Sequence, residues 1–342
     1  MRNESSISVT KMSTVFNFFE VNGIKREKAL ETIGISPSIL ESPDNRLIAD
    51  EVYKILQEAM RLANNESIGL YLGELLSKGF SNILGYVLMN CRTLGDASEK
   101  YCRYEKIVDE TSITDVRIEG SFAIVSITTI DRILLNNRQF SDYKISGLLS
   151  YIKMLTGKSI NLNEVHFTHR KPKDISEYKR IFQCPVYFEK QVSALVFDNL
   201  LLNLPIIEPN NNLLDLFEKK AQETIELYDG DETYSKKVTR IILKEMNRDM
   251  PSIKVVARKL AISVRSLQTY LNKEQTSFTK ILNEIRKDIA LQCLNDNNAS
   301  IDEIAYIIGF SEASAFHRAF KKWTSLTPSE FRVAAHSSYY IQ

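Results

Sequence analysis

The 342-residue sequence predicts an α+β N-terminal domain followed by an all-α C-terminal domain with two helix-turn-helix motifs. Segments rich in β-branched residues lie among helical segments in residues 113–197, which indicates the mixed class. A unit of helix, tight turn and helix occurs twice in residues 257–320, which indicates the helical class. We expect the first domain at residues 1–208, a linker helix at residues 209–235 and the second domain at residues 236–342.

The N-terminal domain begins with several short helices. Residues 10–107 show apolar side chains at helical spacing, as in Val52, Ile55 and Ala59, and Ser-Pro pairs at residues 36 and 42 separate the helices. The strand candidates are a hairpin over Ile113–Ile127 that turns at Gly120-Ser121, followed by Val165–His169, Val186–Glu189 and Ala194–Phe197. This order predicts an α+β domain.

A polar tract from Pro209 to Asn212 should start the linker helix. Its apolar stripe, spaced by three and four residues, comprises Leu213, Leu214, Phe217, Ala221, Ile225 and Tyr228, and the helix should stop near Asp229-Gly230-Asp231. The stripe fits either a dimerisation helix or packing against the helix's own domain. Packing is the more common arrangement for a stripe of this length.

The two helix-turn-helix units bury equivalent positions. A small residue, Ala257 or Ala305, stands where two helices must cross closely, and Leu260 or Ile308 fills the crevice between them. The second helix of each unit buries an i, i+4 pair, which is Leu267 with Leu271 in the first unit and Phe316 with Phe320 in the second. The offset between the units changes from 48 to 49 residues at the turn, so the second turn has one extra residue.

The net charge of +1 conceals an asymmetry between the two ends of the chain. Residues 233–342 contain 17 Lys and Arg against 10 Asp and Glu, a net charge of +7, whereas residues 1–232 contain 27 against 33, a net charge of −6. A basic segment alone is as often a solvated face as a polyanion-binding one. Together with the duplicated motif, the charge favours DNA.

Composition and motifs argue against other classes of protein. Cys91, Cys102, Cys184 and Cys293 form no CxxC pair, which suits a reducing compartment and indicates neither a disulfide framework nor a zinc knuckle. The sequence contains no run of 18 apolar residues and no signal peptide, so we expect a cytoplasmic location and no membrane partner.

Candidate chemistry in the N-terminal domain is weak. His166 and His169 would point to opposite faces of one strand, and Glu164 and Asp174 lack a recognisable acid or base partner. We therefore expect no metal, no cofactor and no catalysis. Some aromatic residues could line an apolar effector pocket but are more often core, namely Phe16, Phe18, Phe19, Tyr71, Phe80 and Tyr86.

Two sets of motifs resemble a known family. The C-terminal part resembles the DNA-binding domain of AraC-family transcription regulators. The motifs that carry this resemblance are Leu267-Gln268-Thr269-Tyr270-Leu271, Arg286 to Ala290, Gly309-Phe310-Ser311, Ala315 to Trp323 and Thr327-Pro328. The N-terminal part is similar to the arabinose-binding-type N-terminal domain of ornithine- and arginine-utilisation regulators. The motifs that carry this similarity are Gly34-Ile35-Ser36, Leu70-Tyr71-Leu72-Gly73, Thr93 to Ala97 and Cys184-Pro185-Val186. The resemblance implies an effector-binding regulatory domain and a transcriptional activator that contacts RNA polymerase, and it would allow a homodimer.

The proposed reading of DNA depends on residues 278–295, whose apolar positions suit a rigid helix buried against both units. Two recognition helices would then enter successive major grooves about 34 Å apart. The outward side chains, our candidates for base contacts, are Arg265, Gln268 and Thr269 on the first helix and Ser314, His317 and Arg318 on the second. Half or more of protein–DNA contacts go to the backbone, so only some of the six should specify sequence.

Phosphate contacts are expected from Lys273, Lys280, Lys321 and Lys322, and from the helix starts at Ser252 and Ser300. The sequence departs from a common family pattern at Thr269-Tyr270, where basic residues often stand. We therefore expect the first unit to depend on the second for affinity.

These observations predict a sequence-specific transcription regulator that binds promoter DNA under the control of a small-molecule effector of unknown identity and site. The alternatives are an enzyme with a DNA-binding tail and a non-specific nucleoid protein. Substrate turnover by the N-terminal domain would favour the first alternative, and equal binding to random DNA would favour the second.

Overall fold

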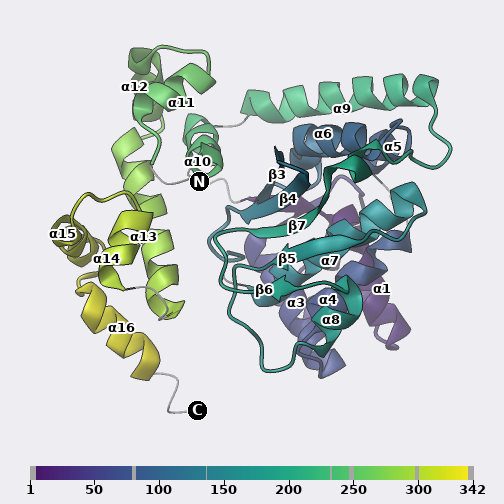
Figure 1. The fold of residues 1–342 in the computed structure, drawn as a ribbon, viewed down its shortest axis with the longest axis horizontal. Coiled ribbons are helices and arrows are strands. Elements are labelled where there is room, and N and C mark those ends of the chain that lie inside the picture. Colours follow the sequence, from purple (N-terminus) through teal and green to yellow (C-terminus); the bar gives the residue numbers. More distant parts are fainter. Residues whose placement is uncertain are drawn as a thin grey trace. The chain divides into compact units, whose positions relative to one another are not determined.

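The computed structural model describes residues 5–78, 82–135, 137–231, 233–245, 250–296 and 300–337. They form two compact units, Met1–Gly230 and Asp231–Gln342. The first unit mixes helices and strands and the second is helical, which confirms the predicted fold class (Figure 1). Within the described ranges, no helix is both long and apolar enough to cross a bilayer.

The first unit opens with the predicted series of short helices. They are α1 (Ser13–Val21), α2 (Arg26–Thr32), α3 (Ala49–Ala63), α4 (Ile68–Glu74), α5 (Ile83–Met89) and α6 (Leu94–Tyr104). Short 3-10 helices lie at Val9–Met12, Pro37–Leu40, Leu75–Lys78, Glu105–Ile107 and Asn199–Asn203. A small antiparallel pair, β1 (Ser6–Ser8) with β2 (Arg46–Ile48), was not expected, because three-residue strands carry too little alternation to show in sequence.

The main sheet has five strands in the order β3-β4-β7-β5-β6, with only β5 and β6 parallel. They are β3 (Ser112–Glu119), β4 (Phe122–Thr129), β5 (Leu162–His166), β6 (Val186–Tyr187) and β7 (Ser193–Asp198). One row of paired residues crosses all five strands and packs into the core, namely Val116, Val125, Leu195, Val165 and Val186. The long helix α7 (Arg138–Thr156) supplies Ile145, Leu149 and Ile152 to the same core.

The predicted hairpin and the three further strands are confirmed, with two corrections at strand ends. The strand predicted as Val165–His169 starts earlier and ends at His166, so His169 lies beyond it. The strand predicted as Val186–Glu189 ends at Tyr187, because the chain turns at Glu189, whose φ of 59° is left-handed.

Helices α4 and α7 approach each other backbone to backbone. A Cβ atom built on Gly73 would lie 1.9 Å from Ser146 Oγ and 2.5 Å from the Tyr143 carbonyl oxygen. A Cβ atom on Gly69 would lie 2.2 Å from the carbonyl oxygen of Gln139. Glycine is therefore required at both positions of α4, since any side chain would push the two helices apart.

Four charged side chains are buried together in the first unit. Lys144 Nζ donates to Asp109 (2.7 Å) and to Glu105 (3.2 Å), and Lys11 Nζ donates to Asp109 (3.1 Å). Burial alone would raise the pKa of Asp109, yet the neighbouring ammonium groups hold it well below its usual range. Burial alone would lower the pKa of both lysines, and the carboxylates raise it instead. Asp109 and the two lysines are therefore charged at neutral pH.

Helix α9 (Asn211–Asp231) begins where the polar tract predicted and packs on its own unit, beside α5 and α6 (Figure 1). Ala221 and Ile225 are buried, and Phe217 stacks on Tyr86 with 5.2 Å between ring centroids. Leu213, which we predicted to lie in the packed stripe, is instead 42% exposed. Its neighbour Leu214 packs against the core, and successive side chains of a helix point about 100° apart. The side chain of Tyr228 lies outside the described residues.

The second unit consists of α10 (Tyr234–Glu245), α11 (Ile253–Lys259), α12 (Val264–Lys273), α13 (Phe278–Asp296), α14 (Ile301–Ile307), α15 (Ala313–Thr324) and α16 (Pro328–Ser337). It has two small cores, one around Leu267 and Leu271 and the other around Phe316 and Phe320. Ile289 of α13 packs against both cores. The connecting helix is therefore buried against both helix-turn-helix units, as predicted.

Candidate nucleic-acid interface

The first helix-turn-helix unit consists of α11 and α12. Ser263 caps α12 by accepting a hydrogen bond from the Ser266 amide (3.0 Å). Leu267 and Leu271 are completely buried, so the opposite face of α12 carries the exposed candidates Arg265, Gln268 and Thr269. The Thr269 hydroxyl donates to the Arg265 carbonyl oxygen (2.9 Å), which leaves the Thr269 methyl group as the part available to a base.

The second unit consists of α14 and α15. Phe316 and Phe320 are completely buried, which leaves Ser314 and Arg318 exposed and His317 half-buried. The Ser314 hydroxyl donates to the Glu312 carboxylate (3.1 Å), and the His317 ring lies 6.2 Å from that of Phe316. Arg318 is therefore the base-contact candidate of α15 with the greatest reach into solvent.

Residues 260–263 join α11 to α12, and residues 308–312 join α14 to α15. The second turn is therefore one residue longer than the first, as the offset between the two units predicted. Both turns use a left-handed residue directly after the crevice-filling side chain. In the second unit this is Gly309 (φ 74°), whereas in the first it is Ala261 (φ 53°). An alanine in this region is strained because its Cβ crowds the backbone.

We expect the Ala261→Gly variant to raise the free energy of unfolding of the second unit by up to about 1 kcal/mol, because relief of left-handed strain outweighs the added freedom of the unfolded chain. Gly309→Ala should lower it by about 1–3 kcal/mol, since its Cβ would also lie 2.9 Å from Met250 Cγ. Urea denaturation of both variants measures the two changes. A less stable Ala261→Gly variant would contradict the assignment of strain.

The connecting helix α13 fixes the second unit through two basic residues to which the sequence analysis assigned no role. Arg286 donates to the carbonyl oxygens of Ile308 and Gly309, both at 2.9 Å, and its guanidinium lies 4.6 Å from the centre of the Phe310 ring. Lys287 donates to the Trp323 carbonyl oxygen at the end of α15 (3.0 Å). Both lie in the stretch that resembles the family motif, and that resemblance was the only signal in the sequence.

The proposed phosphate-contact residues Lys273, Lys280, Lys321 and Lys322 are all exposed. Among the described residues, no carboxylate forms a salt bridge with Lys321, Lys322, Arg265 or Arg318. Lys321 lies close enough to Glu330 to help lower the pKa of that carboxyl. Without a direct ion pair, the four positive charges add to the attraction of a polyanion.

The two proposed helix starts differ in their capping. Ser252 begins α11 without a side-chain hydrogen bond to the helix. Ser300 begins α14 in a capping box, in which its amide donates to the Glu303 carboxylate (2.7 Å) and its hydroxyl accepts from the Glu303 amide (3.2 Å). The hydrogen bond from the Ser300 amide lowers the pKa of the Glu303 carboxyl. A phosphate at Ser300 would have to compete with this carboxylate, whereas the start of α11 at Ser252 has no such competitor in its cap.

Tyr270, where the sequence departs from the family pattern, packs inside the second unit. Its ring stacks on that of Tyr234 with 4.1 Å between centroids, and Lys273 and Lys237 lie over the two rings. Glu274 at the end of α12 accepts hydrogen bonds from the Tyr234 and Ser235 amides (2.6 and 2.8 Å), which caps α10. The tyrosine thus ties the first recognition helix to α10.

The N-terminal candidates are not gathered into one site. His166 donates to Glu164 (2.8 Å), and His169 donates to the buried Asp142 (3.0 Å). Phe16, Phe18 and Phe19 are buried in the helical core, Tyr71 and Tyr86 are partly exposed, and Phe80 lies outside the described residues. Most of the predicted aromatic lining is therefore ordinary core or surface.

Residues 23–206 match the profile described as the arabinose-binding domain of AraC transcription regulator, N-terminal, and residues 256–334 match a helix-turn-helix domain profile. The ornithine utilization regulator of Pseudomonas aeruginosa is 26% identical over 91% of this chain and 92% of its own. The urease operon transcriptional activator of Escherichia coli is 30% identical over 32% of this chain and 37% of its own. The solved structure of the transcriptional regulator CdpR from Pseudomonas aeruginosa is 21% identical, with a TM-score of 0.45 over 94% of this chain and 98% of that one.

The first profile covers more than half of the 342 residues, and the second coincides with α11 to α16. An effector-binding type of domain is thus joined to a DNA-binding domain with two recognition helices. This arrangement is that of a DNA-binding transcription regulator under small-molecule control. The chain belongs to the AraC family of transcription regulators.

Proposed function

We propose that this regulator recognises its promoter site through the exposed faces of α12 and α15, which would lie in successive major grooves. One observation carries the proposal: both helices bury an i, i+4 pair completely and therefore present equivalent polar faces. Helix α13 packs into both cores, which supports its role as the rigid spacer that two successive grooves about 34 Å apart would require.

The side chains at this surface suggest separate roles. Arg265 and Arg318 suit guanine, Gln268 suits adenine, and the Thr269 methyl group suits thymine, while Ser314 and His317 can accept or donate at either base type. Lys273, Lys280, Lys321, Lys322 and the helix starts at Ser252 and Ser300 would hold the phosphate backbone.

The basic unit should account for the salt dependence of DNA binding. We expect residues 233–342 to bind duplex DNA with an affinity that falls linearly with salt on logarithmic scales, with a slope of about −4 if the four lysines each neutralise one phosphate. Residues 1–232, with a net charge of −6, should show no such binding. Fluorescence anisotropy over a range of salt concentrations measures the slope, and a flat response of the fragment would exclude the proposed backbone contacts.

Two variants on α15 should separate base reading from backbone contact. Arg318→Ala should relax base preference at one position of the site at a cost of about 1–3 kcal/mol, because the exposed guanidinium lies on the outward face. Lys321→Ala should weaken binding to every sequence and reduce the salt slope by about one. Selection of bound duplexes from a random pool measures both effects.

Lys220→Ala, on the exposed surface of α9, is the control for loss of a positive charge and should change neither the motif nor the slope. If Arg318→Ala leaves the selected motif unchanged while Lys321→Ala alters it, the orientation of α15 on DNA is wrong. Failure to select any motif with the unmodified chain would favour a non-specific DNA-binding protein.

The remaining parts of the proposal come from the family. A small molecule bound by the first unit would shift the chain between arrangements that differ in DNA affinity, by no more than its difference in affinity for them. The same proposal includes contact with RNA polymerase, formation of a homodimer, a cytoplasmic location and regulation without catalysis. Leu213 and Leu216 of α9, which are 42% and 61% exposed, offer an apolar strip for the homodimer.

A further inference from the structure

A cavity of about 30 Å³ lies in the first unit between the sheet and helices α6 and α7. Its walls are mainly aliphatic and come from four elements and the end of α5, namely Leu88, Leu94, Ala97, Val116, Val125, Leu148, Ile152 and Leu155. Its polar wall residues are Ser98, Tyr101, Thr114 and Tyr151. Close packing leaves few spaces of this size, and this one has mostly aliphatic walls with a few polar groups, so the cavity is a candidate ligand site.

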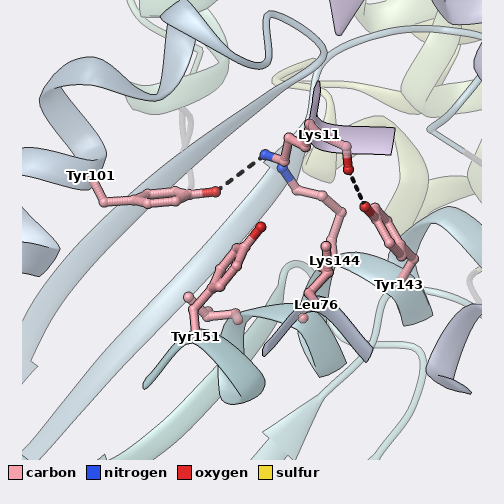
Figure 2. A pocket seen from close by; sticks show the side chains of 8 residues that line it. Lys11, Leu76, Tyr101, Tyr143, Lys144 and Tyr151 are labelled. Atoms are coloured by element: carbon pink, nitrogen blue, oxygen red, sulfur yellow. Dashed lines mark hydrogen bonds between the residues drawn. The ribbon is translucent and has the colours of Figure 1, made fainter. Parts of the chain in front are cut away.

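A second, smaller cavity of about 10 Å³ shares three wall residues with the first, Tyr101, Leu148 and Tyr151. Figure 2 shows the hydroxyls of Tyr101 and Tyr151 and the ammonium groups of Lys11 and Lys144 pointing toward one another at this smaller cavity. The two cavities are therefore neighbours, and together they offer a polar end and an apolar end.

Two polar groups in these walls have unused hydrogen-bonding capacity. Thr114 is only 3% exposed, and its Oγ1 has no hydrogen-bond partner among the described residues. Lys11 Nζ has three N–H donors and uses two of them within the described ranges, toward Asp109 and the Tyr101 hydroxyl. A buried hydroxyl without a partner destabilises the fold, so its presence in a cavity wall points to a ligand.

The charge of the cluster limits the chemistry of that ligand. Lys11 and Lys144 are already balanced by Asp109 and Glu105, all buried within 3.2 Å of a partner. An added carboxylate or ammonium group would leave an uncompensated buried charge. A sugar would bring several hydroxyls into the larger cavity. Its mostly aliphatic walls offer few hydrogen-bond partners for them, so a sugar does not fit.

We propose that these cavities form the effector site and take an uncharged, mostly apolar molecule with a hydroxyl or carbonyl at one end. The oxygen of the ligand meets the Thr114 hydroxyl, and its carbon chain lies among the leucines. The larger cavity has room for about two water molecules, so a longer chain enters by changing the rotamers of Leu88, Leu148 and Leu155. The assignment depends on the proposed control by a small molecule.

The test uses the full chain and four probes that differ in head group. 1-Hexanol, hexanoate and hexylamine share a six-carbon chain and are neutral, anionic and cationic at pH 7, and L-arabinose is a sugar. Ligands that bind only the folded state raise its melting temperature in a saturable way. We expect this response to 1-hexanol alone.

Thr114→Val removes the hydroxyl without changing the shape of the side chain. We expect this variant to melt at a higher temperature than the unmodified chain and to bind 1-hexanol about tenfold more weakly. Thr128→Val on β4 is the matched control, because it makes the same change outside the cavity walls, and it should keep the response. Ala97→Leu should fill the larger cavity and abolish the response.

Three outcomes overturn the assignment: saturable binding of a charged probe or of arabinose but not of 1-hexanol, an unchanged response in Thr114→Val, or no response to any probe. DNA binding measured on the same samples separates this inference from the proposed function. Loss of specific DNA binding would contradict the proposed function. Intact DNA binding without a response to any probe would contradict only the assignment of the cavity.

Discussion

We expect the Asp109→Asn variant to lose about 3–5 kcal/mol of unfolding free energy, more than any other single change considered for this chain. Asp109 is 1% exposed and accepts hydrogen bonds from the ammonium groups of both Lys11 and Lys144. Without its charge, two buried cations share the single carboxylate of Glu105. Urea denaturation at pH 7 measures the loss.

The pH dependence follows from the lowered pKa of Asp109 in the folded state. The stabilisation by this carboxylate is complete above its unfolded pKa of about 3.9 and is lost as the pH falls toward the folded value. The difference in stability between the unmodified chain and Asp109→Asn should therefore be constant near neutrality and shrink below about pH 4.

Asp115→Asn is the matched control, because Asp115 pairs with the exposed Arg117 at 2.7 Å on the rim of the sheet. A pair of this kind contributes less than about 1 kcal/mol. Equal losses in the two variants would show that the buried cluster does not stabilise the fold.

We expect Gly73→Ala to destabilise the first unit by about 3 kcal/mol, because the new methyl group meets backbone that cannot move aside. The Tyr143 carbonyl oxygen lies 2.5 Å and the Gly147 amide nitrogen 2.7 Å from the added Cβ. The higher helix propensity of alanine, worth about 1 kcal/mol, offsets only part of this cost. Thermal unfolding of the full chain measures the change.

Gly95→Ala is the control for helix propensity, since its nearest contact would be 3.2 Å from the Leu202 carbonyl oxygen. It should alter stability by less than about 1 kcal/mol. Combining Gly73→Ala with Ser146→Ala removes the 1.9 Å clash with Ser146 Oγ and should restore only part of the loss. Full restoration would show that the backbone approach is not the limiting contact.

The helix-turn-helix units could be predicted because their determinants are local. The buried pair in each second helix is four residues apart, and the extra residue of the second turn shows directly in the offset between the copies. The hairpin of β3 and β4 was predictable for the same reason, since its strands are joined by Gly120-Ser121.

Other features were missed because the determining contacts are distant in sequence. The pairing of β1 with β2 joins residues about 40 apart, and the exposed position of Leu213 depends on which side of α9 meets α5 and α6. The stack of Tyr270 on Tyr234, at a position where the sequence departs from the family pattern, is visible only in the structure. Neither local periodicity nor composition contains this information.

By itself, the sequence determined the fold class, the duplicated helix-turn-helix unit and the family, because periodicity, turn residues and motif spacing are properties of neighbouring residues. Only the tertiary structure decided where Lys11 and Asp109 meet, 98 residues apart, and which walls enclose the cavity beside Thr114. A lysine or a threonine at a single position looks the same whether it is solvated or buried. Its environment is set by long-range packing, which fixes the partners that it finds or lacks.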